Sequence, residues 1–245
     1  MRKKEETRFL YHAHAIGAAG SFTTPTADFL EAKPSVSLPV TGGRASARVE
    51  NFRFQDILSY RLAETHAVGL FDPQSGAFST LVTVAVEGLN VLNVITADRV
   101  VARLSSRHFL DPEREPSILT LGSHFEGLKI GGHPIEFDLD HQVMSEWDVY
   151  SKAAAGCQAR RSGSVFHRNR IHTSVVTNVR APAGCEVDHH RIHFPDLGTI
   201  HLGEFHITSD ERRLTMLRIQ FGCAVGGEAS CGEVAGNGNS APPAA

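Results

Sequence analysis

The chain has 245 residues, a formal net charge of −3 and 14 histidines. Its 41% of hydrophobic and 21% of charged residues are typical of a globular protein and exclude a disordered or collagen-like chain. Charges of both signs are interspersed, which excludes the basic surface that holds nucleic-acid phosphates, so no nucleic-acid partner is expected. No apolar run reaches the roughly 18 to 20 residues of a membrane-spanning helix, and no such segment is expected.

Residues 1–7 are mostly charged, and we expect a flexible N-terminus there. The basic start is similar to that of a signal peptide, but Glu5 and Glu6 follow it and no apolar stretch comes next. On these residues alone, the expected location is the cytoplasm.

The four cysteines, Cys157, Cys185, Cys223 and Cys231, contain no C-x-x-C pair, which argues against a zinc ribbon or a thioredoxin-type site. In an oxidising compartment they could form two local disulfides, 157/185 and 223/231. The missing export signal favours thiols instead, and both states stay open.

Short strands dominate the expected secondary structure. Apolar residues alternate, or form β-branched runs, at 79–86, 91–95, 99–104, 128–139, 174–179, 199–207 and 214–221. Residues 72–76 (DPQSG) lie between two such runs and predict a hairpin tip. This spacing predicts an all-β fold with sandwich or barrel-like sheets, and a β-solenoid is the second choice.

The remaining segments interrupt or flank the strands. Helical spacing of apolar residues predicts one short helix at 141–155. The polar, basic residues 156–170 predict an exposed loop, and residues 233–245 predict a disordered tail. We therefore expect a single all-β domain over 8–232.

A short pattern recurs about every 38 residues, a period typical of repeat architectures. An apolar residue is followed by Glu, then Gly or Asn, then apolar and polar residues, with the acids at Glu50, Glu87 and Glu126. Gly or Asn at this point suits a positive φ, and the resulting bend lets apolar residues on both sides face one core. The three glutamates are then exposed residues at a bend, or alternatively a carboxylate ladder that binds cations.

Several stretches together resemble the bacterial choice-of-anchor family, over most of residues 30–232. They are 34–39 (PSVSLP) followed by a Gly pair, 86–100 (VEGLNVLNVITADRV), 122–135 (GSHFEGLKIGGHPI), 198–204 (GTIHLGE) and 214–219 (LTMLRI). The resemblance implies an uncharacterised all-β module that is exported or displayed at the surface, with no known activity. The chain departs from that pattern because it shows neither the leader nor an anchor in its tail.

Histidines concentrate near the C-terminal strands. Side chains two apart share one face of a strand, so His189 and His193 form one pair and Glu204 and His206 another, with His201 on the opposite face. Imidazoles and a carboxylate in this pattern can bind a divalent transition metal. We take His189, His193, Glu204 and His206 as candidate ligands, against the alternative of surface histidines.

No catalytic motif for hydrolysis, phosphate binding or dinucleotide binding occurs. The sequence therefore favours a non-enzymatic structural or ligand-binding module without a cofactor. The alternative is a metal-dependent β-barrel enzyme that uses the candidate ligands. A third hypothesis is a homo-oligomer that assembles through exposed strand edges.

Overall fold

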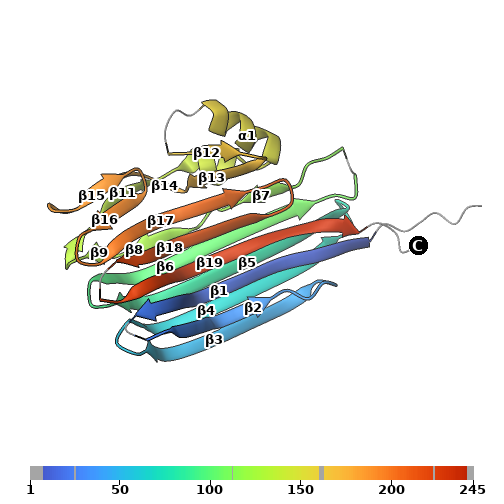
Figure 1. The fold of residues 1–245 in the computed structure, drawn as a ribbon. Coiled ribbons are helices and arrows are strands. Elements are labelled where there is room, and N and C mark those ends of the chain that lie inside the picture. Colours follow the sequence, from blue (N-terminus) through green and yellow to red (C-terminus); the bar gives the residue numbers. More distant parts are fainter. Residues whose placement is uncertain (1–7, 25, 112, 160–162, 223, 242–245) are drawn as a thin grey trace, which may run out of the picture.

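The computed structural model describes residues 8–24, 26–111, 113–159, 163–222 and 224–241 (Figure 1). Within these residues, one antiparallel sheet has nine strands: β1 (Arg8–Thr24), β2 (Asp28–Ser37), β12 (Val165–His167), β13 (Arg170–Ser174), β15 (Glu186–Asp188), β16 (Arg191–Phe194), β17 (Gly198–Ile207), β18 (Arg212–Gly222) and β19 (Gly226–Ala241). We call it the first sheet. Its long strands run in the order β13-β17-β18-β19-β1-β2.

The second sheet has eight strands among the described residues: β3 (Gly43–Phe54), β4 (Leu58–Asp72), β5 (Ala77–Val91), β6 (Ile95–His108), β7 (Ser117–Leu119), β8 (His124–Glu126), β9 (Lys129–Ile130) and β10 (His133–Pro134). A small third sheet pairs β11 (Glu136–Leu139) with β14 (Val176–Arg180). The hairpin tip expected at 72–76 lies between β4 and β5.

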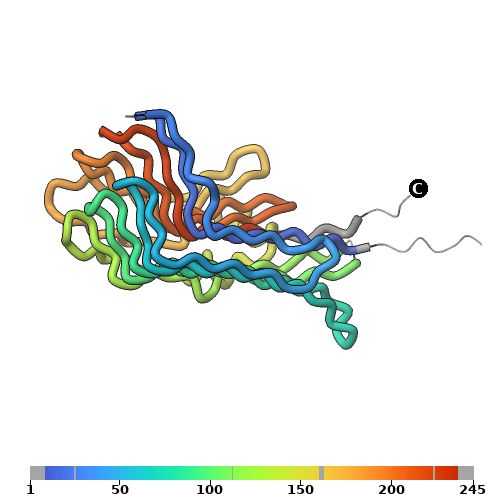
Figure 2. The backbone as a smooth tube through the Cα atoms, turned by 90° about the horizontal axis from the view of Figure 1, so that it is seen from below, coloured from blue at the N-terminus to red at the C-terminus, as the bar shows by residue number. Residues whose placement is uncertain are grey.

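The first and second sheets stack as two layers, which Figure 2 shows edge-on. Strands β1, β18 and β19 pack on β4, β5 and β6, and the core lies between them. The all-β prediction is confirmed, and neither sheet closes into a barrel or a solenoid over the described residues. No described helix has the length and apolar character needed to cross a membrane.

A line of residues with positive φ crosses the second sheet, as the repeat predicts. Asn51, Gly88 and Gly127 have φ values of 51°, 64° and 61°. Their preceding glutamates lie in one cross-strand row through the pairs 50/62, 62/87, 87/99 and 99/126. We call this line the crease of the second sheet.

Burial changes phase at the crease, which is the bend the sequence predicts. On β5, Val82, Val84 and Val86 are fully buried before Gly88, and the next buried residues are Leu89 and Val91. Strict alternation would instead expose Leu89 and Val91. The positive φ therefore keeps both halves of the strand in the core.

The first sheet has a corresponding crease at Gly203 of β17 and Gly232 of β19, with φ values of 60° and 70°. A Cβ on Gly232 would lie 3.1 Å from Cγ1 of Val100 on β6. The two creases therefore face each other across the core, because Val100 follows the crease of the second sheet.

The helical segment predicted at 141–155 is present, but it consists of two helices instead of one. These are η1, a π-helical turn (Gln142–Glu146), and α1 (Tyr150–Ala159). Trp147 leaves helical geometry with φ −85° and ψ 42°, and its N–H donates to the carbonyl of Gln142. Buried side chains on both sides of this break produced the apparent helical period.

The loop predicted at 156–170 is partly wrong. Helix α1 continues to Ala159, and the hairpin of β12 and β13 begins at Val165. Arg168 and Asn169, with positive φ, form its turn. Residues 160–162 lie outside the described residues.

The disordered tail predicted at 233–245 is wrong as far as Ala241, because β19 pairs with β1 up to Arg8. Its small residues need no large apolar side chain, since main-chain hydrogen bonds hold the strand. Residues 242–245 and the N-terminal residues 1–7 lie outside the described part.

Three cysteines can be placed. Cys157 and Cys231 are buried thiols and Cys185 is a half-buried thiol, so the 157/185 disulfide is not formed. Burial raises the pKa of Cys231 to about 12. Cys223 lies outside the described residues.

Candidate functional site

A polar cluster lies on the outer face of the first sheet, where β16, β17 and β18 are neighbours. The register places Arg191, His201 and Arg218 side by side across the three strands. Glu204 lies on the same face as His201 although it is three residues further along β17. The positive φ of Gly203 changes the phase of the strand between them.

Glu204 and Arg218 form the centre of this cluster. Nε of Arg218 donates to Oε2 of Glu204 at 2.5 Å, and its Nη2 donates to Oε1 at 2.8 Å. The side chain of Glu204 is only 12% exposed. Burial raises the pKa of Glu204, but the hydrogen bonds from Arg218 outweigh it and hold that pKa well below its usual range.

Two buried histidines complete the cluster. Nδ1 of His201 lies 2.9 Å from Oε1 of Glu204, and Nε2 of His190 lies 3.8 Å from the same oxygen. Nη2 of Arg218 is also 3.1 Å from Nδ1 of His201. A guanidinium only donates and an ionised carboxylate only accepts, so Nδ1 of His201 can hydrogen-bond to one of the two at a time. Nε2 of His201 lies 3.2 Å from the side-chain oxygen of Gln220.

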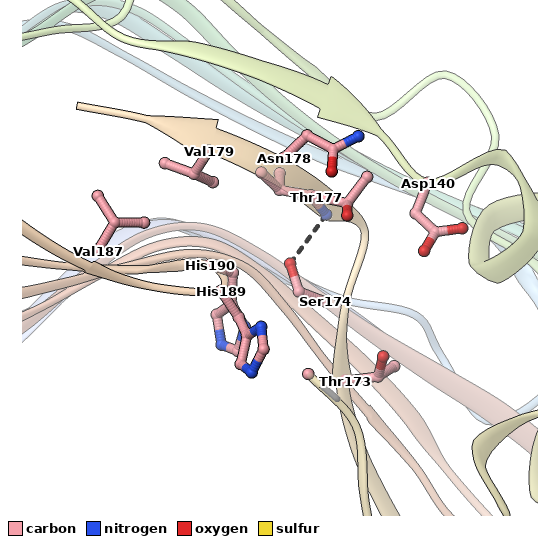
Figure 3. A pocket seen from close by; sticks show the side chains of 11 residues that line it. Asp140, Thr173, Ser174, Thr177, Asn178, Val179, Val187, His189 and His190 are labelled. Atoms are coloured by element: carbon pink, nitrogen blue, oxygen red, sulfur yellow. Dashed lines mark hydrogen bonds between the residues drawn. The ribbon is translucent and has the colours of Figure 1, made fainter. Parts of the chain in front are cut away.

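The cluster forms one wall of a pocket of about 600 Å³. The turn between β15 and β16, which contains Asp188, His189 and Arg191, lines another part of it, and so do His172 and His206. A smaller adjoining pocket of about 290 Å³ shares His189, His190 and Thr173 with it. Figure 3 shows His189 and His190 among the residues that line this smaller pocket.

The four predicted metal ligands do not come together as predicted. His189 lies in the turn between β15 and β16 with φ 56°, exposed, 3.7 Å from Asp188. His193 is exposed, with Nδ1 3.5 Å from Oγ1 of Thr199. Only Glu204 belongs to the cluster, whereas His206 lines the same pocket against His172.

Among the described residues, one group of three possible metal ligands lies close together: His190, His201 and Glu204, whose ligand atoms are within 4.8 Å of one another. Sequence reasoning missed His190 because 189–190 form a turn, and it missed His201 because it assumed regular alternation along β17. The glycine at 203, next to an acid as in the repeat, was the signal that could have placed His201 correctly.

The repeat glutamates are separated by intervening strands and do not form a continuous ladder. Each has a cationic or imidazole neighbour. Arg48 lies 2.5 Å from Glu50, Arg61 lies 2.5 Å from Glu87, and His124 lies 3.0 Å from Glu126. This arrangement fits exposed residues at a bend better than a cation site.

A family model described as a domain of unknown function (DUF8256) matches residues 9–155. No curated protein and no solved structure shows a significant match to the chain. The matched residues include all eight described strands of the second sheet, whereas His190, His201, Glu204 and Arg218 lie outside them.

Proposed function

The chain belongs to the DUF8256 family, a family of unknown function, and we propose that it is a non-enzymatic module that binds a small polar ligand. The ligand would occupy the pocket of about 600 Å³ on the outer face of the first sheet. An exported or surface location, which the choice-of-anchor resemblance implies, is part of the same proposal.

One observation carries this proposal: a half-buried ion pair, flanked by two buried histidines, borders an open pocket away from the core. Removing an ion pair from water costs desolvation free energy, and the attraction between the two charges does not always compensate for it. Stability of the fold alone is therefore a weak reason for the pair to be there. Clusters of this kind are typical of binding sites, where fixed donors and acceptors receive a ligand.

The position of Arg218 favours binding over metal catalysis. Its Nη2 contacts both Oε1 of Glu204 and Nδ1 of His201, two of the atoms that would ligate a metal. The guanidinium of Arg218 thus already provides the positive charge next to Glu204 and His201 that a bound metal ion would provide.

The pocket lining indicates the chemistry of the ligand. Imidazoles of His172, His190 and His206 and the guanidinium of Arg191 offer donors, while Asp188 offers acceptors. A ligand with several hydroxyl or carboxylate oxygens, such as a sugar acid or a small hydroxy acid, fits this mixture.

Histidine-ring NMR tests the proposal. A library of small sugars, sugar acids and hydroxy acids is titrated into the full chain while ring ¹H–¹⁵N correlations are recorded. We expect at least one compound to shift the signals of His190 and His201 and to leave those of exposed His133 unchanged. A library that moves neither ring, or moves all histidines equally, contradicts the proposal.

A metal-dependent enzyme is the second candidate, favoured by the closeness of His190, His201 and Glu204. Arg218 would have to leave Glu204 for a metal to bind. Elemental analysis of protein purified without a histidine tag tests this candidate. About one equivalent of a transition metal that is lost in His201→Gln would support it, whereas a metal-free protein would contradict it.

A further inference from the structure

Two histidines outside the central cluster lie directly opposite each other on neighbouring strands. His172 on β13 pairs with His206 on β17, and their ring centroids are 4.3 Å apart at an interplanar angle of 71°. No hydrogen bond to either ring occurs among the described residues. From this pair we infer a transition-metal site in which both imidazoles bind one ion.

The geometry suits such an ion. Metal–imidazole bonds of about 2.0 to 2.1 Å require two ligating nitrogens no more than about 4 Å apart. Rings whose centroids are 4.3 Å apart can present nitrogens within that range. The antiparallel pairing holds both residues in place, so little freedom is lost when the ion binds.

Ions can reach the pair from two sides. His172 and His206 line both the pocket of about 600 Å³ and a second pocket of about 550 Å³. Two protein ligands leave the other coordination positions to water or to a small anion. Imidazole ligands favour Cu²⁺, Ni²⁺ and Zn²⁺, and Cu²⁺ binds most tightly of the three in the usual order.

The charges around the pair limit its affinity without preventing binding. Arg213, opposite His206, lies 3.4 Å from Glu211 and 3.7 Å from Glu233, and Arg218 is paired with Glu204. Arg170 lines the second pocket, and no acidic partner is found for it among the described residues.

Calorimetric titration of Cu²⁺ into the tag-free full chain tests this inference. We expect about one equivalent to bind, and at least tenfold weaker binding in His172→Gln and in His206→Gln. His133→Gln, at an exposed position on β10, is the control and should bind as the parent does. The electron paramagnetic resonance spectrum of the copper complex should show coupling to two nitrogens in the parent and to one in each variant.

The inference does not rest on the proposed ligand pocket, and the outcomes separate the two. Unchanged Cu²⁺ affinity in both variants would overturn it. Cu²⁺ binding that is lost in His201→Gln but kept in His172→Gln would also overturn it. The metal would then be bound by His190, His201 and Glu204 instead. Circular dichroism melting of each variant verifies that the fold is intact.

Discussion

A histidine buried in the core contributes a pH-dependent term to stability. His108 is 4% exposed, and its ring lies 5.2 Å from that of Phe9. Burial lowers the pKa of His108 to about 4. Because the unfolded chain binds this proton near pH 6.5 and the folded chain does not, the contribution is complete above pH 6.5 and is lost as the pH falls toward 4.

We therefore expect His108→Leu to flatten the pH dependence of unfolding between pH 7 and 4.5. The parent should lose about 2 to 3 kcal/mol more than the variant over this range. The measurement is urea unfolding at several pH values, with His133→Leu as an exposed control. Equal slopes in the parent and His108→Leu would show that the ring is not held neutral.

Arg212 is the largest polar side chain that is fully buried. Its Nη1 donates to the carbonyls of Ile118 at 2.9 Å and Trp147 at 2.5 Å, which ties β18 to β7 and to the break between the two helices. Burial lowers the pKa of Arg212 to about 10, so it stays charged at neutral pH.

Replacing Arg212 by Met should lower the free energy of unfolding by about 2 to 4 kcal/mol, because two buried carbonyls lose their donor. Exposed Arg44 provides the matched control, and Arg44→Met should change stability by less than about 0.5 kcal/mol. Denaturant unfolding of both variants gives the comparison. Similar small effects in the two would mean that water replaces the guanidinium.

At the scale of elements, Gly203 determines whether His201 and Glu204 share a face. Its φ is 60°, and a Cβ there would lie 2.7 Å from Cγ2 of Val175. We expect Gly203→Ala to destabilise the protein by about 1 to 3 kcal/mol and to change the NMR signal of the His201 ring. Gly132→Ala is the control: its φ is 79°, but nothing lies within 4 Å of the added Cβ.

The control should lose about 1 kcal/mol from backbone strain alone, without a change at His201. A Gly203→Ala variant as stable as Gly132→Ala, with an unchanged His201 signal, would contradict the role assigned to the crease.

Sequence patterns predicted those features that depend on local chemistry. The strand runs, the hairpin tip at 72–76 and the positive φ after Glu50, Glu87 and Glu126 all follow from side chains and turn residues near in sequence. The His190–His201–Glu204 set did not follow, because it depends on a turn at 189–190 and on the crease at Gly203. Arg218 was missed because its partner lies on another strand.

Self-assembly through strand edges stays a hypothesis at the scale of the whole molecule. Strands β2 and β3 each form an edge of their sheet. The edge strand β3 carries exposed charges at Arg44, Arg48 and Glu50, which are typical of edges that avoid pairing. Light scattering that gives a monomeric mass would contradict assembly.

The course of the chain makes the last strand central to the fold. Strand β19 pairs with β18 on one side and β1 on the other, and it packs on β5 and β6. Residues 9–155, which match the family model, contain β1 and its neighbour β2 but not its other neighbour, β19. The matched segment therefore needs the C-terminal strands to complete the first sheet.

A chain ending at residue 232 should consequently fail to unfold cooperatively, although the sequence of the removed residues is typical of a disordered tail. It would remove the β19 partners of residues 8–16 of β1, and it would remove buried Val234 and Ala235 from the core. A chain ending at Ala241 keeps every described strand and should melt as the full chain does. Calorimetric melting of the two truncated chains tests this prediction. Equal transitions would mean that residues 233–241 add nothing to the sheet. Loss of the transition only in the shorter chain would show that the main-chain pairing of residues 233–241 holds the two layers together.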